Sequence, residues 1–354
     1  MKLNFKKKIT PYIIAEIGIN HNGYLKIAKK LILESKLAGA NAVKFQKRDV
    51  TDLVNFNKTP GKSIGYLSKH ANDIKKTKIK FGGWVYPDVR LELSDKDYLE
   101  IKKYTKKLKI DLIITPWDEK SMSFVKKLGV KYIKIASIDA NNYHFCEFVA
   151  KHRLPTIIST GMCTYNEILI TQKIFKKYKT PHIFLHCTSA YPSDEKDKNL
   201  NCIPVLKKIL NDEVGFSGHG TGVVGAVGAT ALGAKIIEKH VTLNKKMHGP
   251  DHAASLEFST FKNMVELCKK VKISLGDKNK KFLKSEKVLH NILIRKFVIR
   301  KNIKKGSKFN FNNIKTALTY KNSGILPKYY LKILGKRSRR NLKIGHVISW
   351  ADVR

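Results

Sequence analysis

Residues 12–23 read YIIAEIGINHNG, an apolar run followed directly by a polar turn. The run shows no alternation of polar and apolar residues, which is typical of a parallel strand buried on both faces. The turn at residues 18–23 lacks the G-x-G-x-x-G spacing of a dinucleotide site in an open, doubly wound sheet. The stretch therefore favours the first strand of a different α/β fold.

Seven more short apolar runs follow, each ahead of a turn and a helical pattern. The helical patterns include amphipathic segments before Gly39 and after Ser94, and a capping box at residues 164–167. Eight strand–helix units predict a (β/α)8 TIM barrel. The predicted strands are 12–17, 42–46, 112–115, 132–136, 156–160, 182–187, 214–217 and 236–240.

The chain divides into three parts by pattern. Residues 1–276 carry the strand–helix units, and residues 277–290 are polar and lysine-rich, as expected of a linker. Residues 291–354 have short β-like runs punctuated by glycines, which predicts a small β-rich domain. Within the barrel, the interval between the second and third strands is unusually long. Its aromatic and glycine-rich residues 81–90 predict an ordered loop over the barrel mouth.

The composition excludes some classes of protein. The 354 residues carry 70 Lys and Arg against 28 Asp and Glu, a net charge of +42, yet 42% are hydrophobic, which excludes disorder throughout. The basic residues are spread in pairs along polar helix faces, which indicates a solvated surface rather than a nucleic-acid footprint. The densest run, residues 336–340, is the one place where nucleic-acid binding stays an alternative.

The location is predicted to be cytoplasmic. The five cysteines are scattered and odd in number, which argues against a disulfide framework or a zinc knuckle. Residues 1–14 are a poor signal peptide, since Glu16 and Asn20 soon interrupt the apolar run. The long uncharged stretch 220–234 is shorter than the ~18–20 residues of a spanning helix, so no membrane association is expected.

Polar residues stand at the end of all eight predicted strands, where barrel enzymes carry out their chemistry. Two lysines and several hydroxyls there predict a pocket for a phosphate and a carboxylate. These strand-end residues are Glu16; Lys44 and Gln46; Thr115; Lys134 and Ser137; Ser159 and Thr160; His186, Thr188 and Ser189; Ser217 and His219; and Glu238 and His240.

Two histidines point to a metal. His219 and His240 end neighbouring strands, so their side chains can share one divalent ion, with Glu16 and Glu238 near enough to orient ligands or move protons. Residues 248–252 read HGPDH, and their two histidines, His248 and His252, are rival ligands.

These strand-end motifs resemble the sialic acid synthase family. The resemblance runs in order through nearly the whole chain, and the tail resembles the antifreeze-like domain of that family. The motifs are IAEIGINHNG at 14–23, KFQ at 44–46, KIAS at 134–137, STGM at 159–162, HCTSAYP at 186–192, SGH at 217–219, EKH at 238–240, GILP at 324–327 and LGK at 334–336.

The resemblance implies condensation of phosphoenolpyruvate with an N-acetylated amino sugar, of the N-acetylmannosamine type, to a nonulosonic (sialic) acid and phosphate. It implies attack of C3 of phosphoenolpyruvate on the sugar aldehyde, addition of water at C2, and loss of phosphate by C–O cleavage. Lys44, Thr115, Lys134, Ser137 and Ser159 would hold phosphoenolpyruvate. Further substrate-binding candidates are Gln46, Ser189, Tyr191 and Ser217.

The resemblance also assigns catalytic, metal and partner roles. Glu16 would contact the sugar and handle protons, and Glu238 would support the site as a second catalytic carboxylate. His219 and His240 would bind Mn²⁺ or Mg²⁺, which would act as a Lewis acid on the aldehyde. The family also implies a homodimer in which the antifreeze-like domain closes over the partner's barrel.

The sequence departs from the family pattern in places. Some members carry Asn at Ser189 and Asp at Gly218. Several relatives have an Arg-Pro-Gly-x-Gly run whose arginine reaches the partner's sugar site, whereas residues 320–324 here read YKNSG. Either Lys321 substitutes for the arginine or the N-acyl end of the sugar is recognised differently, since lysine and arginine are not interchangeable at a bidentate site. Legionaminate- or pseudaminate-type synthesis from a diacetamido sugar is therefore an alternative, as is a Schiff-base aldolase using Lys134 or Lys44.

Overall fold

The structure is a computed structural model that describes residues 10–49, 91–319 and 323–354. Contacts divide the chain into two units, residues 1–276 and 277–354. The predicted loop at 81–90, and Tyr320, Lys321 and Asn322 of the tail, lie outside the described residues.

The first unit is a closed barrel of eight parallel strands. Each strand pairs with the next, and β1 pairs with β8 to close the ring, which confirms the predicted (β/α)8 fold. The barrel strands are β1 Tyr12–Gly18, β2 Ala42–Lys47, β3 Asp111–Pro116, β4 Tyr132–Ile135, β5 Thr156–Ser159, β6 His182–Cys187, β7 Val214–Gly218 and β8 Ile236–Thr242.

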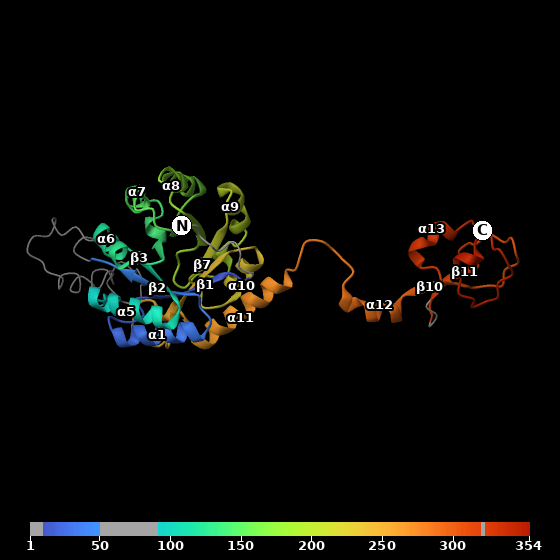
Figure 1. Cartoon of the computed structure of the whole chain (residues 1–354), viewed down its shortest axis with the longest axis horizontal. Coiled ribbons are helices and arrows are strands. Elements are labelled where there is room, and N and C mark those ends of the chain that lie inside the picture. The colour runs from blue at the N-terminus through green and yellow to red at the C-terminus, as the bar shows by residue number, and fades with distance from the viewer. Residues whose placement is uncertain (1–9, 50–90, 320–322) are drawn as a thin grey trace, which may run out of the picture. The chain divides into compact units, whose positions relative to one another are not determined.

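Helices surround the strands (Figure 1). Their apolar faces pack on the outer face of the barrel. The predicted capping box begins α8 at Thr164, and a further one begins α5 at Ser94. Among the described residues, the α-helices of the first unit are α1 Leu25–Leu37, α5 Asp95–Leu108, α6 Glu119–Leu128, α7 Tyr143–Lys151, α8 Tyr165–Lys177, α9 Cys202–Leu210, α10 Val224–Ala231 and α11 Phe258–Ser274. No helix within the described ranges is both long and apolar enough to cross a membrane.

The register of the strands brings the polar strand ends to one level. Glu16 of β1 lies opposite Lys44 of β2 on one side and opposite His240 of β8 on the other. Gln46 likewise lies opposite Thr115 of β3. Because these residues share a level near the carboxyl ends of their strands, their side chains meet at one mouth of the barrel.

The second unit contains a small β-rich core. Strands β10 Arg295–Ile299 and β11 Ile314–Leu318 pair in antiparallel fashion, and a short helix, α13 Tyr330–Ile333, follows. Part of the segment expected to be a linker is helical, since α12 Lys287–Leu293 begins inside it. The buried apolar residues of this unit are Phe297, Ile299, Ile303, Phe309, Ile314, Ile325, Ile333, Leu342 and Ile348.

Asp352 anchors this second unit. Its side chain is fully buried, accepts hydrogen bonds from His346 at 2.9 Å and from the Ser349 backbone N–H at 2.9 Å, and pairs with Arg340 at 2.6 Å. Burial opposes ionisation, but these hydrogen bonds lower the pKa of Asp352 to about 2. The carboxylate therefore stabilises the unit above about pH 4, and this contribution is lost as the pH falls towards 2.

Replacing Asp352 by alanine is expected to destabilise the second unit by roughly 2–4 kcal/mol, because Arg340 and His346 lose their buried partner. Amide hydrogen exchange of β10 and β11 in the full chain measures this as a loss of protection of about 30- to 10³-fold. Asp277→Ala, which changes an exposed carboxylate, is the control and should leave protection unchanged. Equal protection in both variants would show that the Asp352 network does not stabilise the unit.

Candidate active site

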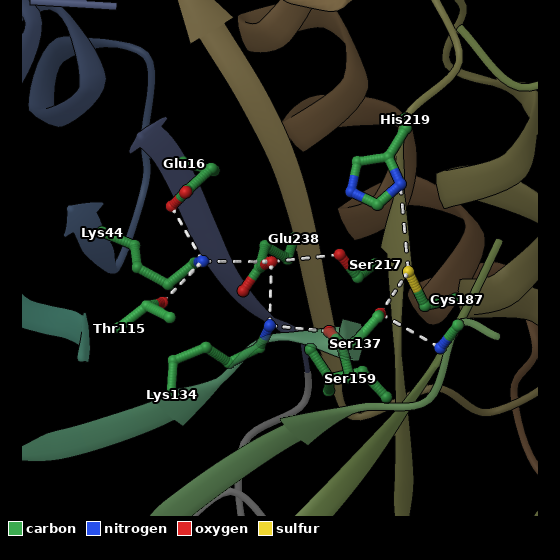
Figure 2. Close-up of polar contacts among 12 residues, drawn as sticks. Glu16, Lys44, Thr115, Lys134, Ser137, Ser159, Cys187, Ser217, His219 and Glu238 are labelled. Carbon is green, nitrogen blue, oxygen red and sulfur yellow. Dashed lines mark hydrogen bonds and ion pairs between the residues drawn. The ribbon is translucent and has the colours of Figure 1, made fainter. Parts of the chain in front are cut away.

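Two buried lysines form the centre of the barrel mouth. Lys44 Nζ lies 3.2 Å from Thr115 Oγ1, and Lys134 Nζ lies 2.6 Å from Ser159 Oγ (Figure 2). Both ammonium groups approach the same carboxylate oxygen, Glu238 Oε1, at 3.5 Å and 3.4 Å. Two cations and two hydroxyl donors thus converge from β2, β3, β4 and β5, an arrangement suited to a small anion.

The two carboxylates of this network have different protonation behaviour. Burial works against ionisation of Glu238, but Lys134 and Lys44 outweigh it and lower its pKa, and Ser217 Oγ donates to Oε1 at 3.0 Å. Burial raises the pKa of Glu16, and Lys44 at 3.1 Å only partly opposes this. When the environment pushes the pKa values of two neighbouring carboxyl groups apart, one commonly stays ionised and the other transfers protons.

Gly18 lies closely packed beside Glu16. Gln46 Nε2 donates to Glu16 Oε1 at 3.1 Å, and Gly18 adopts φ +56° next to these groups. A Cβ at Gly18 would lie 3.2 Å from Glu16 Oε1, 3.3 Å from Gln46 Nε2 and 3.5 Å from Asp251 Oδ2. A side chain at residue 18 would therefore crowd Glu16 and Gln46, and the positive φ independently favours glycine there.

A second group of donors adjoins the lysines. Ser137 Oγ accepts from the Gly161 N–H at 3.1 Å and lies 3.5 Å from Cys187 Sγ (Figure 2). A Cβ at Gly161 would lie 2.2 Å from Ser189 Oγ, so the backbone approaches both hydroxyls closely. Ser189 Oγ is buried and has no hydrogen-bond partner among the described residues. An unpaired buried hydroxyl is costly, which suits a group that pairs with a ligand.

His219 has one ring nitrogen directed into the site. Its Nδ1 lies 2.9 Å from the Thr188 carbonyl oxygen, which can only accept, so Nδ1 carries a hydrogen. In the neutral ring, Nε2 therefore holds the lone pair, and it accepts from the Tyr191 hydroxyl at 2.9 Å. A ring N–H fixed on a backbone carbonyl is the usual support for a metal-binding imidazole.

His240 stands beside His219 with a ring-centroid separation of 5.4 Å. Burial and the neighbouring His219 lower the pKa of His240 well below its usual range, so its ring is neutral at pH 7. Its Nδ1 has no hydrogen-bond partner within the described part of the chain and lies 3.8 Å from Asp251 Oδ2. The pair fits a shared divalent ion, because metal–nitrogen bonds of about 2.1 Å place two ring centres roughly 5 Å apart.

The protein would supply only part of the coordination sphere. No group of three or more His, Cys, Asp or Glu side chains forms a complete metal site in residues 10–49, 91–319 and 323–354. Water and substrate would therefore complete the sphere, as in open catalytic sites. His252 is not available as a ligand, since its Nδ1 contacts Thr242 Oγ1 at 2.7 Å and its Nε2 contacts Asn22 Oδ1 at 3.3 Å.

Two residues of the site were missed by the sequence reasoning, although both lie inside quoted motifs. Asp251 stands between the two histidines of HGPDH, and its pKa is raised by burial. Cys187 lies 3.9 Å from His219 Nδ1; burial alone would raise its pKa, but His219 and Ser137 lower it to about 7. The signal for Asp251 was a carboxylate in a loop directly after a strand that carries site residues.

Three strand-end residues belong to the scaffold instead. Thr160 Oγ1 donates to the Leu185 carbonyl at 2.9 Å, and Thr188 Oγ1 donates to the Asp197 carbonyl at 2.8 Å. His186 Nε2 contacts the Lys198 carbonyl at 2.7 Å. The other strand-end candidates and Tyr191 lie together at the carboxyl ends of the barrel strands, in the contacts described above.

The closed barrel gathers paired lysines and carboxylates, with imidazoles adjoining them, at the carboxyl ends of its strands, where barrel enzymes carry their active sites. Residues 31–280 match the NeuB family, and residues 295–354 match the SAF domain. The chain belongs to the NeuB family, the sialic acid synthase family with an antifreeze-like domain that its motifs resemble. It is accordingly a synthase of the transferase type.

Named relatives span nearly the whole chain. N,N'-diacetyllegionaminic acid synthase of Legionella pneumophila is 33% identical over 351 residues, which cover 98% of this chain and 95% of that protein. Pseudaminic acid synthase of Campylobacter jejuni is 34% identical over 358 residues, which cover 99% of this chain and 98% of that protein. The crystal structure of N-acetylneuraminic acid synthetase from Leptospira borgpetersenii has a TM-score of 0.66 and 32% identity, covering 80% of this chain and 92% of that one.

Proposed function

We propose that the protein condenses phosphoenolpyruvate with an N-acetylated amino sugar, giving a nonulosonic acid and phosphate. The observation that carries this proposal is the pair of buried lysines, Lys44 and Lys134, that share Glu238 and face hydroxyl donors from two further strands. Such a site can hold the phosphate and carboxylate of one small ester. The neighbouring imidazoles face the position where a second substrate would meet it.

Each step can be assigned to residues of the chain. Lys44, Lys134, Thr115 and Ser159 would orient phosphoenolpyruvate so that the π electrons of C3 form a bond to the aldehyde carbon. Glu16, whose pKa is raised by burial, would donate a proton to the new alkoxide. The resulting carboxylate would then accept a proton from the water that adds at C2.

The last step is loss of phosphate. The C2–O bond of the tetrahedral intermediate breaks, the electron pair leaves with the phosphate, and the C2 hydroxyl becomes the keto group as it loses its proton. Lys44 and Lys134 would stabilise the charge that develops on the leaving oxygen. Glu238, kept ionised by the lysines, would hold both ammonium groups in place through the cycle.

A divalent metal is part of the proposal. His219 and His240 would hold Mn²⁺ or Mg²⁺, with Asp251 beside them. When bound, the ion would supply Lewis-acid polarisation of the sugar aldehyde.

Tyr191 is expected to compete with the metal. Its hydroxyl occupies His219 Nε2 at 2.9 Å, and the two rings stack with a centroid separation of 4.0 Å. Because this hydrogen bond must break, Tyr191→Phe should tighten Mn²⁺ binding about 2- to 10-fold, the equivalent of one hydrogen bond. Calorimetric titration without substrates measures this; weaker binding in the variant would show that the hydroxyl assists the ion instead.

A second copy of the chain would complete the enzyme. Apolar side chains on and before α12 are 54–67% exposed in the single chain, too large an apolar stretch to stay in water. We propose that they pack in a homodimer in which the second unit of one copy covers the barrel of the other. Sedimentation of the full chain tests this. The exposed residues are Phe282, Leu283, Val288, Leu289, Ile292 and Leu293.

The free cysteines of the protein fit a reducing compartment of the cell. All five cysteines are free, and Cys146, Cys187 and Cys268 are buried. Since none forms a disulfide, we propose that the enzyme works in the cytoplasm.

The identity of the sugar is tested by a panel. Phosphate release from phosphoenolpyruvate is measured with N-acetylmannosamine, its 6-phosphate and diacetamido hexoses, each with Mn²⁺ and with EDTA. We expect release with one class of sugar and its loss in EDTA. Release with a diacetamido sugar alone would identify the legionaminate or pseudaminate alternative.

A Schiff-base aldolase is a second candidate. Burial lowers the pKa of Lys134, and the negative charge of Glu238 offsets this effect only in part. An amine that is neutral more of the time is a better nucleophile for a carbonyl group. Borohydride would then reduce the imine between pyruvate and Lys134 to a stable adduct, detected as an increase in the mass of the protein. Activity would be insensitive to EDTA. The synthase proposal predicts no trapped adduct.

A further inference from the structure

Two loops of the barrel mouth are joined by buried side chains. Asn20, directly after β1, donates through Nδ2 to the Val241 carbonyl at 2.9 Å and to Ser255 Oγ at 2.9 Å. Ser255 Oγ in turn donates to the Asp251 carbonyl at 2.6 Å. A continuous chain of hydrogen bonds therefore runs from the end of β1 to the backbone of Asp251.

A second contact closes the same two loops. Asn22 Nδ2 donates to the His248 carbonyl at 2.9 Å, and Asn22 Oδ1 lies 3.3 Å from His252 Nε2. Gly249, at φ +156°, has no room for a side chain, because a Cβ would lie 2.5 Å from the His252 ring. The NHNG and HGPDH motifs thus form one clasp.

The clasp ends on a group of the candidate site. Asn20, Ser255 and His252 are almost completely buried, so their hydrogen bonds are shielded from water. The Asp251 carboxylate, in the loop that these hydrogen bonds hold, points towards His240, with Oδ2 lying 3.8 Å from Nδ1. A Cβ at Gly18 would lie 3.5 Å from the same Asp251 oxygen. A network that only stabilised the fold would not need to end beside a buried carboxylate.

We propose that Asn20 and Ser255 are positioning residues, which hold the Asp251 carboxylate where it accepts a hydrogen bond from the sugar substrate. This inference rests on the proposed function. A misplacement of about 1 Å in such a group costs activity on the order of 10²-fold. The clasp contacts neither lysine of the anion site, so binding of phosphoenolpyruvate should not depend on it.

The inference is tested with Asn20→Ala, Ser255→Ala, Asp251→Asn, the double variant Asn20→Ala/Asp251→Asn and the conservative variant Ser255→Thr. We expect Asn20→Ala and Ser255→Ala to lower kcat/KM for the sugar by about 10- to 100-fold, with the Kd for phosphoenolpyruvate within twofold of wild type. The double variant should be no worse than Asp251→Asn alone, because residues that act through one another are not additive. Ser255→Thr, which keeps the hydroxyl, should retain most of the activity.

Asn41→Ala is the matched control. Asn41 Oδ1 accepts from the Ile13 N–H at 2.8 Å at the opposite end of the barrel, so its loss should leave both constants unchanged. Additive losses in the double variant, an equal loss in Asn41→Ala, or a parallel loss of phosphoenolpyruvate binding would overturn the inference. If Asn20→Ala does not fold, Ser255→Ala and its double variant with Asp251→Asn give the same comparison.

Failure of the proposed function is distinguishable from failure of this inference. If the wild type turns over no sugar, the proposed function is wrong, and the positioning is then judged from a crystal structure of Asn20→Ala. An Asp251 carboxylate displaced from His240 supports the inference. An unchanged 3.8 Å separation overturns it.

Discussion

Replacing Lys134 by methionine is expected to lower kcat/KM for phosphoenolpyruvate by about 10³-fold. Lys134 is one of two ammonium groups in the candidate anion site, and it lies 2.6 Å from Ser159 Oγ and 3.4 Å from Glu238 Oε1. Methionine fills most of the space of the lysine side chain, one atom shorter, and removes the charge that would stabilise the departing phosphate. Loss of one such donor typically costs 10²–10³ in rate, and a full charge more than a neutral donor.

The same change should not unfold the protein. Burial lowers the pKa of Lys134, which means that the folded state disfavours its charged form. The change takes one partner from the buried Glu238 carboxylate, which keeps Lys44 and Ser217 as partners. The loss of stability should therefore stay below the roughly 3–5 kcal/mol of a buried charge left with no partner. Thermal unfolding and steady-state kinetics on the same preparation separate the two effects.

Lys131→Met is the matched control. Lys131 precedes the same strand, β4, at the other end of the barrel, and it forms an exposed ion pair with Asp111 at 2.7 Å. The Lys131→Met substitution changes the net charge of the chain by the same amount as Lys134→Met. If both variants lose activity equally, the general charge of the protein matters rather than the site.

Replacing His240 by alanine is expected to abolish turnover while the fold stays intact. The ring is one of two imidazoles in the candidate metal site, and its removal leaves only His219. We expect Mn²⁺ binding to weaken by at least about 10²-fold and turnover to fall with it. Phosphoenolpyruvate binding should persist, because Lys44 and Lys134 are retained.

His182→Ala is the control for this experiment. His182 begins β6 at the opposite end of the barrel, where its Nδ1 lies 2.8 Å from the Thr180 carbonyl. This variant should bind Mn²⁺ like the wild type. Wild-type rates in His240→Ala would remove His240 from the metal site.

The barrel could be predicted because its strands are buried on both faces. Each strand is a short apolar run that ends in a polar residue, and parallel pairing brings those ends to one level, as with Glu16 beside Lys44 and His240. The grouping of lysines and hydroxyls followed from that geometry alone.

The loops could not be predicted in the same way. The roles of Asn20 and Asp251 depend on contacts between the loop after β1 and the loop after β8, which lie more than two hundred residues apart in the sequence, and local patterns carry no signal for them. His252 was considered as a ligand because its residue type suits metals, yet both of its nitrogens are used to join loops. Cys187 became part of the site only through its closeness to His219.

The most direct test of the central claim uses phosphoenolpyruvate labelled with ¹⁸O in the bridge between C2 and phosphorus. Phosphate and keto acid are measured by mass spectrometry in one reaction with the sugar that the panel identifies. Condensation with C–O cleavage predicts equal amounts of the two products, with the label in the phosphate. Unlabelled phosphate, or phosphate formed without a nine-carbon keto acid, would contradict the account.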